Sequence, residues 1–245
     1  MNLIVGRKPV LEAINSGEEI EQVYILFGQK GGIIDDIRIA AKKRGIKVNQ
    51  ITSEKFKTLT DHPNSQGVIA RKASHKFYEI NEIISSSKNK QYPLLIILDS
   101  IQDTHNLGAI LRSAECSDVD GVIVTKFNSA PVNETVVKTS AGATEYLKIA
   151  QVNNLVQAIK LLKDNGFWIV GASLENSKPY TEIDYKIPVA LVLGNEEKGI
   201  RRLTSENCDI LINIPMRGKI QSLNVSVAAG IILFEILRQR NPIIL

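Results

Sequence analysis

The sequence predicts an α/β protein in which a small α/β unit precedes a larger domain built on a parallel sheet. Its 245 residues are 44% hydrophobic, which is enough for one or two domains with real cores. From residue 94 onward, continuous apolar runs alternate with helical patterns, as expected for parallel strands covered by helices on both faces. Just before, SSSKNKQYP at residues 85–93 has the polar, proline-ended composition of a linker.

The first 73 residues alternate helical and strand patterns in short segments. We expect helices at residues 7–16, 33–44 and 53–59, and strands at residues 23–27, 46–51 and 67–71. Gly45 is the expected stop of the second helix, because glycine readily adopts the left-handed conformation that ends helices. Ser53 is the expected N-cap of the third, since its hydroxyl accepts from free backbone N–H groups. The first predicted domain is therefore residues 1–73.

The segment at residues 74–93 is predicted to be an interdomain linker with a short helix at residues 78–86, and the second domain is predicted at residues 94–245. The expected strands of this domain lie at residues 94–98, 121–124, 168–171, 189–193 and 210–214. Its expected helices lie at residues 107–116, 133–140, 155–164 and 223–238. Strands that alternate with helices in this way imply a parallel sheet.

Positive charge is concentrated in the first part of the chain. Residues 1–92 hold 15 Lys and Arg against 10 Asp and Glu, and residues 38–76 alone hold ten Lys and Arg against only Glu54 and Asp61. One interpretation is a solvated helix face, because most charge runs are simply surface. The other is a docking surface for a polyanion such as RNA, since Lys and Arg displace counterions from phosphates. The candidate RNA contacts are Arg7, Lys42, Lys43 and Arg44.

Several other classes of function lack their usual sequence features. The longest mostly apolar stretch, residues 225–234, is too short to cross a bilayer, and no signal-peptide pattern is visible, so we expect a cytoplasmic protein. Two cysteines make no disulfide framework, and none of the three histidines has a second ligand at metal-binding spacing, so no metal site is expected. The phosphate loop, the dinucleotide fingerprint and the G-x-S-x-G motif are missing as well.

Three polar segments follow predicted strands, at the place where open α/β sheets bind their ligands. They are residues 99–115, 194–200 and 214–230. The side chains that stand out in them are Asn106, Arg112, Gly194, Ser222 and Asn224. Each segment alone has a simpler interpretation: a capping Asn106 or Ser222, an exposed arginine, or an ordinary glycine turn.

Taken together, the three segments resemble the motifs of the SpoU (TrmH-like) family of RNA ribose 2′-O-methyltransferases. The family's N-L-G-x-x-x-R-x-A motif stands here as NLGAILRSA at residues 106–114. Its G-N-E-x-x-G motif after a strand stands here as ALVLGNEEKGI at residues 190–200. Its third motif, I-P-M-x-G followed by S-L-N-V-S-V-A, stands here as IPMRGKIQSLNVSVA at residues 214–228.

The first part of the chain resembles the L30e-like substrate-binding domain that many family members carry, in GRKPVLEAI at residues 6–14 and QGVIA at residues 66–70. The whole arrangement is most similar to the members that methylate a guanosine of 23S ribosomal RNA. Three positions depart from a common family pattern: Thr104 replaces a proline, Glu197 a glycine and Ser65 a histidine. The change at Ser65 leaves the RNA contacts of this domain open.

The resemblance implies transfer of a methyl group from S-adenosylmethionine to a ribose 2′-hydroxyl of RNA. It places Asn106, Arg112, Glu196, Ser222 and Asn224 in the catalytic centre. Arg112 is expected to stabilise the developing alkoxide rather than to abstract the proton, because arginine stays protonated in proteins. An RNA phosphate is the alternative proton acceptor. The neutral polar side chains would hold the ribose and phosphate, and Glu196 either hydrogen-bonds locally or pairs with Arg112.

The resemblance also implies a cofactor pocket lined by Gly194, Ile214 and Leu223, with Thr144 and Met216 nearby. Simple core packing is the alternative for Met216. Apolar walls would take the adenine, and backbone groups at strand ends would recognise its edge. The family fold further implies a deep trefoil knot in the C-terminal segment and a homodimer that the last helix helps to form; hydrophobic periodicity indicates neither.

Three alternatives stay open. The same motifs serve tRNA 2′-O-methyltransferases, so the class of RNA is not fixed. A non-catalytic RNA-binding protein with a degenerate methyltransferase domain is the second, although the catalytic motifs are intact. A NAD-dependent oxidoreductase is the third, and the missing glycine fingerprint counts against it. RNA is the expected partner, with neither DNA nor a membrane expected.

Overall fold

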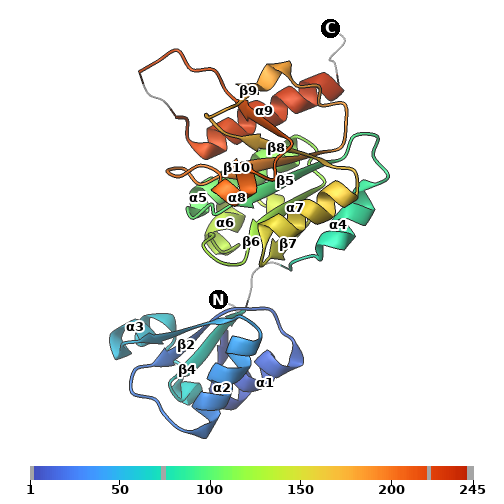
Figure 1. Ribbon diagram of the computed structural model, residues 1–245. Coiled ribbons are helices and arrows are strands. Elements are labelled where there is room, and N and C mark those ends of the chain that lie inside the picture. The colour runs from blue at the N-terminus through green and yellow to red at the C-terminus, as the bar shows by residue number, and fades with distance from the viewer. Residues whose placement is uncertain (1–2, 73–75, 220–221, 242–245) are drawn as a thin grey trace. The chain divides into compact units, whose positions relative to one another are not determined.

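The chain divides into two compact units, Met1–Lys76 and Phe77–Leu245. Figure 1 shows the computed structural model, which describes residues 3–72, 76–219 and 222–241. None of the helices in these ranges is long and apolar enough to cross a bilayer.

The first unit is a four-stranded sheet with helices on both faces. Its elements are β1 (Leu3–Val5), α1 (Arg7–Ser16), β2 (Ile20–Leu26), α2 (Gly32–Lys43), β3 (Lys47–Ile51), α3 (Ser53–Leu59), the 3₁₀ turn η1 (Pro63–Ser65) and β4 (Val68–Lys72). The strand order is β1-β4-β2-β3, with β2 and β3 parallel and β4 antiparallel to both its neighbours. Because successive side chains of a strand face opposite sides, Val23 and Ile25 pack with α1 and α2, whereas Tyr24 packs with Phe56 of α3.

Two helix ends were predicted in this unit, and one of the two predictions is correct. Gly45 ends α2 as predicted: it has a φ of +64°, and the next N–H, of Ile46, donates to the carbonyl of Ala41 at 2.8 Å. The N-cap of α3 is Thr52 rather than Ser53, since its Oγ1 accepts from the N–H of Lys55 at 3.4 Å. Thr52 has the extended backbone that an N-cap needs, whereas Ser53 is already helical.

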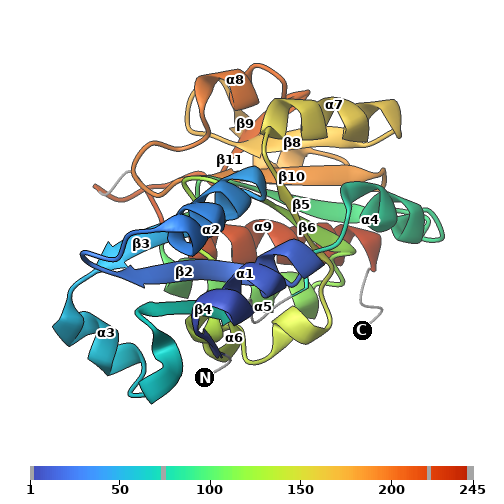
Figure 2. The ribbon, with the colours of Figure 1, turned by 90° about the horizontal axis from the view of Figure 1, so that it is seen from below.

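The second unit is built on a seven-stranded sheet in the order β7-β6-β5-β10-β8-β11-β9, and every neighbouring pair is parallel. The strands are β5 (Leu94–Asp99), β6 (Gly121–Thr125), β7 (Ile149–Val152), β8 (Trp168–Ala172), β9 (Lys178–Pro179), β10 (Val189–Gly194) and β11 (Ile210–Asn213). The helices are α4 (Ile80–Ser87), α5 (Thr104–Cys116), α6 (Glu134–Thr139), α7 (Leu155–Asp164), α8 (Arg202–Ser205) and α9 (Val225–Arg240), with 3₁₀ turns η2 (Ala143–Glu145) and η3 (Tyr180–Glu182). Figure 2 shows α7 and α8 on one side of the sheet and α5, α6 and α9 on the other.

The central strand β5 explains why the sequence predicted a parallel sheet. Leu94, Ile96 and Leu98 lie in the core beneath α5, α6 and α9, whereas Leu95 and Ile97 lie in the core beneath α4 and α7. Both faces of the strand are covered, so both need apolar side chains and no polar alternation remains. The α/β class with a parallel sheet is confirmed.

The structure differs from the predicted linker at residues 74–93. From Phe77 onward this segment belongs to the second unit. Ile83 and Ile84 of α4 are buried against the sheet, and Gly121 makes the close packing possible, since a Cβ there would lie 2.4 Å from Ile83. The helix predicted at residues 78–86 is present as α4, but it packs on the sheet of the second unit instead of lying in a linker.

The last helix, α9, begins two residues later than predicted. Asn224 is its N-cap, with Oδ1 accepting from the N–H of Ser226 at 2.9 Å, so the capping interpretation of Ser222 is wrong. The sequence also missed the peripheral elements β1, β7, β9 and α8. The knot and the homodimer stay predictions.

Candidate functional site

The three polar segments leave the sheet at one edge, because they follow the carboxyl ends of the parallel strands β5, β10 and β11. The register pairs Gly194 directly with Asp99, so the segments that begin at Ser100 and Asn195 start side by side. Ligands of open α/β sheets bind at this edge. The predicted convergence of motifs at strand ends is therefore present in the structure.

Asp99 ties the first segment to the second. Its carboxylate is fully buried and accepts from the backbone N–H of Arg201 at 3.0 Å and from the guanidinium Nε of the same residue at 2.6 Å. A buried carboxylate needs such partners to offset its desolvation. Asp99 was not among the predicted site residues; an acidic residue that closes an apolar run was the available signal.

Gly194 lies beneath a closed loop. The N–H of Asn195 donates to the carbonyl of Gly199 at 3.0 Å, and the N–H of Gly199 donates back at 2.8 Å. A Cβ on Gly194 would lie 2.1 Å from the carbonyl carbon of Gly199. Only glycine fits this close backbone approach, so the segment is more specific than an ordinary glycine turn.

A chain of side-chain hydrogen bonds joins all three segments. Asn224 Nδ2 donates to Asn106 Oδ1 at 2.9 Å, and Asn106 Nδ2 donates to Glu196 Oε1 at 2.8 Å. The other oxygen of Glu196 accepts from Asn195 Nδ2 at 3.2 Å, and this amide also donates to the carbonyl of Ser100 at 3.1 Å. We call Asn106, Glu196 and Asn224 the amide network. Its bonds fix the orientation of the Asn106 amide, and helix capping falls to Asp103 instead, which accepts from the N–H of Asn106 at 2.8 Å.

A cavity of about 640 Å³ opens beside the amide network, which is a size suited to a nucleoside-like ligand. Six predicted residues contribute to its wall: Gly194, Glu196, Ile214, Met216, Ser222 and Leu223. Apolar side chains such as Leu193 and Ile232 share the wall with carboxylates such as Glu175, which suits a ligand that combines an aromatic base with a positive charge.

Arg112 forms no bond with the amide network. It is exposed on α5, and among residues 3–72, 76–219 and 222–241 no hydrogen bond or ion pair joins it to another side chain. The alternative in which Glu196 pairs with Arg112 is thus not what the structure shows; Glu196 bonds Asn106. Arg112 does not line the cavity either, so its guanidinium is available to a bound molecule.

Thr144 does not lie where the resemblance placed it. It is buried on η2 and is absent from the cavity wall. Its Oγ1 finds no hydrogen-bond partner within the described ranges. Met216, by contrast, lines the cavity rather than the core, so the packing interpretation is wrong for it.

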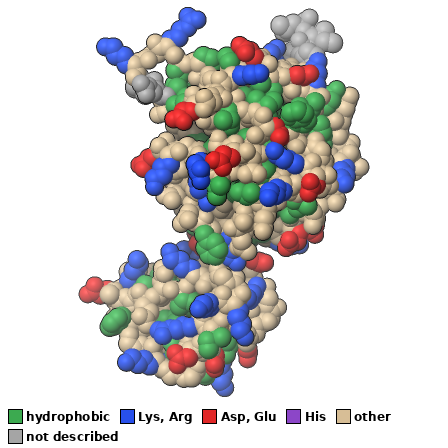
Figure 3. Space-filling model, viewed as in Figure 1, with side chains coloured by type: hydrophobic (Ala, Val, Ile, Leu, Met, Phe, Trp, Pro, Cys, Tyr) green, Lys and Arg blue, Asp and Glu red, His purple; other side chains and the backbone are tan. Residues whose placement is uncertain are grey.

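The predicted RNA contacts in the first unit divide into two kinds. Arg44 donates to the carbonyls of Ile14, Gly17 and Glu18 at 2.7–3.1 Å and so holds the end of α1, and the guanidinium of Arg7 donates to the carbonyl of Gln66 and to the Gln29 side chain. Lys42 and Lys43 are exposed. Lys and Arg side chains are spread over the face of this unit seen in Figure 3.

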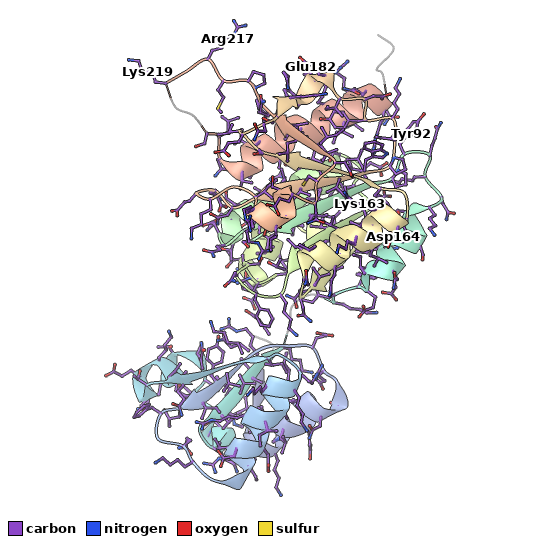
Figure 4. All side chains as sticks on the ribbon, viewed as in Figure 1. Tyr92, Lys163, Asp164, Glu182, Arg217 and Lys219 are labelled. Atoms are coloured by element: carbon purple, nitrogen blue, oxygen red, sulfur yellow. The ribbon has the colours of Figure 1, made fainter. Side chains whose placement is uncertain are left out.

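Two cations that were not among the predicted RNA contacts follow the cavity residue Met216. Arg217 and Lys219 follow Met216 on the segment after β11, and both are exposed and point away from the body of the second unit (Figure 4). No group of three or more potential metal ligands occurs in the part of the chain that the structure describes.

Known proteins share both the fold and the motifs. The SpoU rRNA Methylase family pattern matches residues 93–234, and the RNA 2′-O ribose methyltransferase substrate binding pattern matches residues 3–78. A protein of Staphylococcus saprophyticus assigned to the TrmH family of tRNA/rRNA methyltransferases is 42% identical over 242 residues, which cover 98% of this chain and 97% of that one.

Two solved structures resemble the whole chain. The AdoMet-bound rRNA methyltransferase from Sinorhizobium meliloti has a TM-score of 0.62 and 26% identity, covering 97% of this chain and 87% of that one. The SpoU methyltransferase AviRb from Streptomyces viridochromogenes has a TM-score of 0.62 and 23% identity, covering 97% and 89%, and it supports the fold alone.

Fold, cavity and amide network together define an α/β RNA methyltransferase whose cofactor is S-adenosylmethionine. The chain belongs to the SpoU family of RNA methyltransferases. This assignment decides against the NAD-dependent oxidoreductase, and the intact motif residues Asn106, Arg112, Ser222 and Asn224 count against a degenerate, non-catalytic protein.

Proposed function

We propose that the protein methylates the ribose 2′-hydroxyl of a guanosine in 23S ribosomal RNA. The observation that carries the proposal is the amide network of Asn106, Glu196 and Asn224, which reaches the wall of the 640 Å³ cavity through Glu196. The match of the first unit to the substrate-binding pattern supports the 2′-hydroxyl as acceptor. The guanosine and the ribosomal RNA rest on the resemblance of the two-unit arrangement.

The cavity supplies the groups that S-adenosylmethionine needs. When bound, the cofactor provides the methyl group. Gly194, Ile214 and Leu223 would meet the adenosine through backbone groups and apolar surface, with Met216 beside them. Glu175 and Glu196 place negative charge in the wall, which favours a positively charged ligand.

The side chains at the mouth of the cavity would align and polarise the acceptor. Ser222, Asn106 and Asn224 offer neutral hydrogen bonds to the ribose and its phosphate. Glu196 acts as a positioning residue, because it holds the amide of Asn106. Arg112 stabilises the developing alkoxide, while an RNA phosphate next to the ribose accepts the proton.

The homodimer is part of the proposal. α9 packs against α5 and still leaves Val227 and Phe234 about half exposed, at 50% and 49%. A second copy that covers this helix would bury apolar surface that otherwise meets water. Sedimentation at micromolar concentration tests this part, and a monomer contradicts it. A cytoplasmic location is also proposed, because the proposed substrate is ribosomal RNA.

The experiment that tests the function uses radiolabelled S-adenosylmethionine with two unmodified substrates, a 23S ribosomal RNA transcript and a pool of tRNA transcripts. We expect label in the ribosomal RNA, at one ribose that becomes resistant to alkaline cleavage on its 3′ side. The Arg112→Ala variant is the matched control. Label in tRNA alone would favour the tRNA alternative. The S. saprophyticus relative is assigned to a family of tRNA/rRNA methyltransferases, so both kinds of RNA are tested.

A further inference from the structure

The turn between β6 and α6 presents an aromatic side chain at the carboxyl edge of the sheet, the same edge that carries the amide network. Phe127 lies in this turn and is 59% exposed. β6 pairs with β5, with Val124 opposite Leu98, so the turn leaves the sheet beside the segment that leads to Asn106. The N–H of Ala130 then donates to the carbonyl of Ile101 at 2.7 Å, which ties the end of the turn to that same segment.

The position of Phe127 sets it apart from the other exposed aromatic residues of the second unit. Tyr146 precedes β7, and Trp168 is the first residue of β8, so both lie toward the amino edge of the sheet, opposite the cavity. Phe234 lies on α9. Among the large exposed aromatics of residues 77–219 and 222–241, Phe127 is the one that follows a strand at the carboxyl edge.

The turn that carries Phe127 is held on both sides. The hydroxyls of Thr125 and Ser129 bond across its base, and the N–H of Lys126 donates to the carbonyl of Val152 at 2.9 Å. Asn128 has a φ of +58°, the left-handed conformation that reverses the chain at the tip. An aromatic ring on a turn fixed in this way loses little conformational freedom on binding.

We propose that Phe127 is the platform on which an unpaired base of the substrate RNA stacks, in the nucleotides that flank the methylated ribose. This inference rests on the proposed RNA substrate. Proteins recognise RNA mainly at unpaired segments, where exposed bases stack on aromatic side chains. Such stacking tolerates any base, because every base has a π-face. Phe127 therefore fixes the position of the RNA strand, and this brings the ribose to be methylated within reach of the amide network.

The test compares Phe127→Ala, Phe127→Leu and Phe127→Tyr in methyl transfer to the unmodified 23S ribosomal RNA transcript. One base–aromatic stack contributes enough that its loss should raise the KM for RNA about tenfold or more in the Ala and Leu variants. Phe127→Tyr keeps the π-face and should stay within about twofold of the wild type. The kcat and the KM for S-adenosylmethionine should not change. Trp168→Leu, at the amino edge, is the matched control and should leave the KM for RNA unchanged.

Three outcomes would overturn the inference: an unchanged KM for RNA in Phe127→Ala, a wild-type KM in Phe127→Leu, or a sedimentation coefficient that changes in Phe127→Ala. The second would indicate apolar packing without stacking, and the third a contact between two copies of the chain. If the wild type methylates neither the 23S ribosomal RNA transcript nor the tRNA transcripts, the proposed function is wrong, whatever the role of Phe127. Filter binding of the same transcript to the wild type and to Phe127→Ala then still decides the stacking role.

Discussion

The two units share a plan, with helices on both faces of a sheet, yet their polar residues are used differently. In the first unit, the guanidinium groups of Arg7 and Arg44 donate to backbone carbonyls and so stabilise the fold. In the second, Asn106, Glu196 and Asn224 bond one another beside a cavity. An excess of cations therefore does not locate the RNA contacts, whereas bonds among side chains from distant segments do mark the chemical site.

The largest effect is expected at Arg112, which the second unit leaves exposed. Loss of a group that stabilises developing negative charge lowers kcat by about 10²–10³-fold, so we expect this for Arg112→Ala. The affinity for S-adenosylmethionine, measured by calorimetry, should not change, since Arg112 does not line the cavity. Arg112→Lys is the matched variant: it keeps the charge but lacks the planar fork and should recover part of the rate. Near-wild-type turnover of the Ala variant would remove Arg112 from the catalytic centre.

A smaller effect is expected at Gly194. In Gly194→Ala the new methyl group would lie 2.1 Å from the carbonyl carbon of Gly199, so the loop that covers it must move. Overpacking of this kind costs about 1–3 kcal/mol, and we expect cofactor affinity to fall about tenfold or more. Gly32→Ala in the first unit is the control, because no atom lies within 4 Å of a Cβ there. Equal cofactor binding by both variants would show that the loop does not shape the cavity.

Parts of the fold that depend on local pattern were predictable. β5 and β10 have continuous apolar runs because both faces are covered. β7 was missed: it is a short strand at the edge of the sheet, and its sequence, IAQV, mixes buried and exposed residues. Elements with few buried side chains leave a weak hydrophobic signal.

At the site, the sequence predicted which residues take part but not which of them bond to one another. The motifs identified Asn106, Glu196 and Asn224, but not that Glu196 holds Asn106 across 90 residues of chain. The bond between Asp99 and Arg201 spans 102 residues and was missed entirely. The hydrogen bonds of Arg44 were missed for a related reason, because its partners are backbone carbonyls, which exist at every residue and leave no mark in the sequence.

The structural role of Arg44 in the first unit can be tested by measuring the free energy of unfolding, without an RNA assay. Hydrogen bonds to a charged group contribute about 1.5–3 kcal/mol. Since the side chain is only half-buried, we expect Arg44→Ala to lower the free energy of unfolding of the first unit by about 2 kcal/mol at most. Lys43→Ala, one residue earlier and fully on the surface, should change it by less than about 0.5 kcal/mol. Urea unfolding of the whole chain measures both. Equal stability of the two variants would contradict the structural role of Arg44.

The smallest effect is expected for the two exposed lysines at the end of α2. Charge reversal would place anions at the negative end of the helix dipole and confuse folding with binding, so Lys42→Gln and Lys43→Gln are combined instead. If both side chains meet RNA phosphates, the slope of log affinity against log salt should fall by about 1.4–1.8, at about 0.7–0.9 for each contact. Filter binding to the 23S ribosomal RNA transcript at several salt concentrations measures it. An unchanged slope would make this stretch of α2 a solvated helix face. Arg217 and Lys219, which come after Met216 in the sequence, would then be the next pair to neutralise in the same assay.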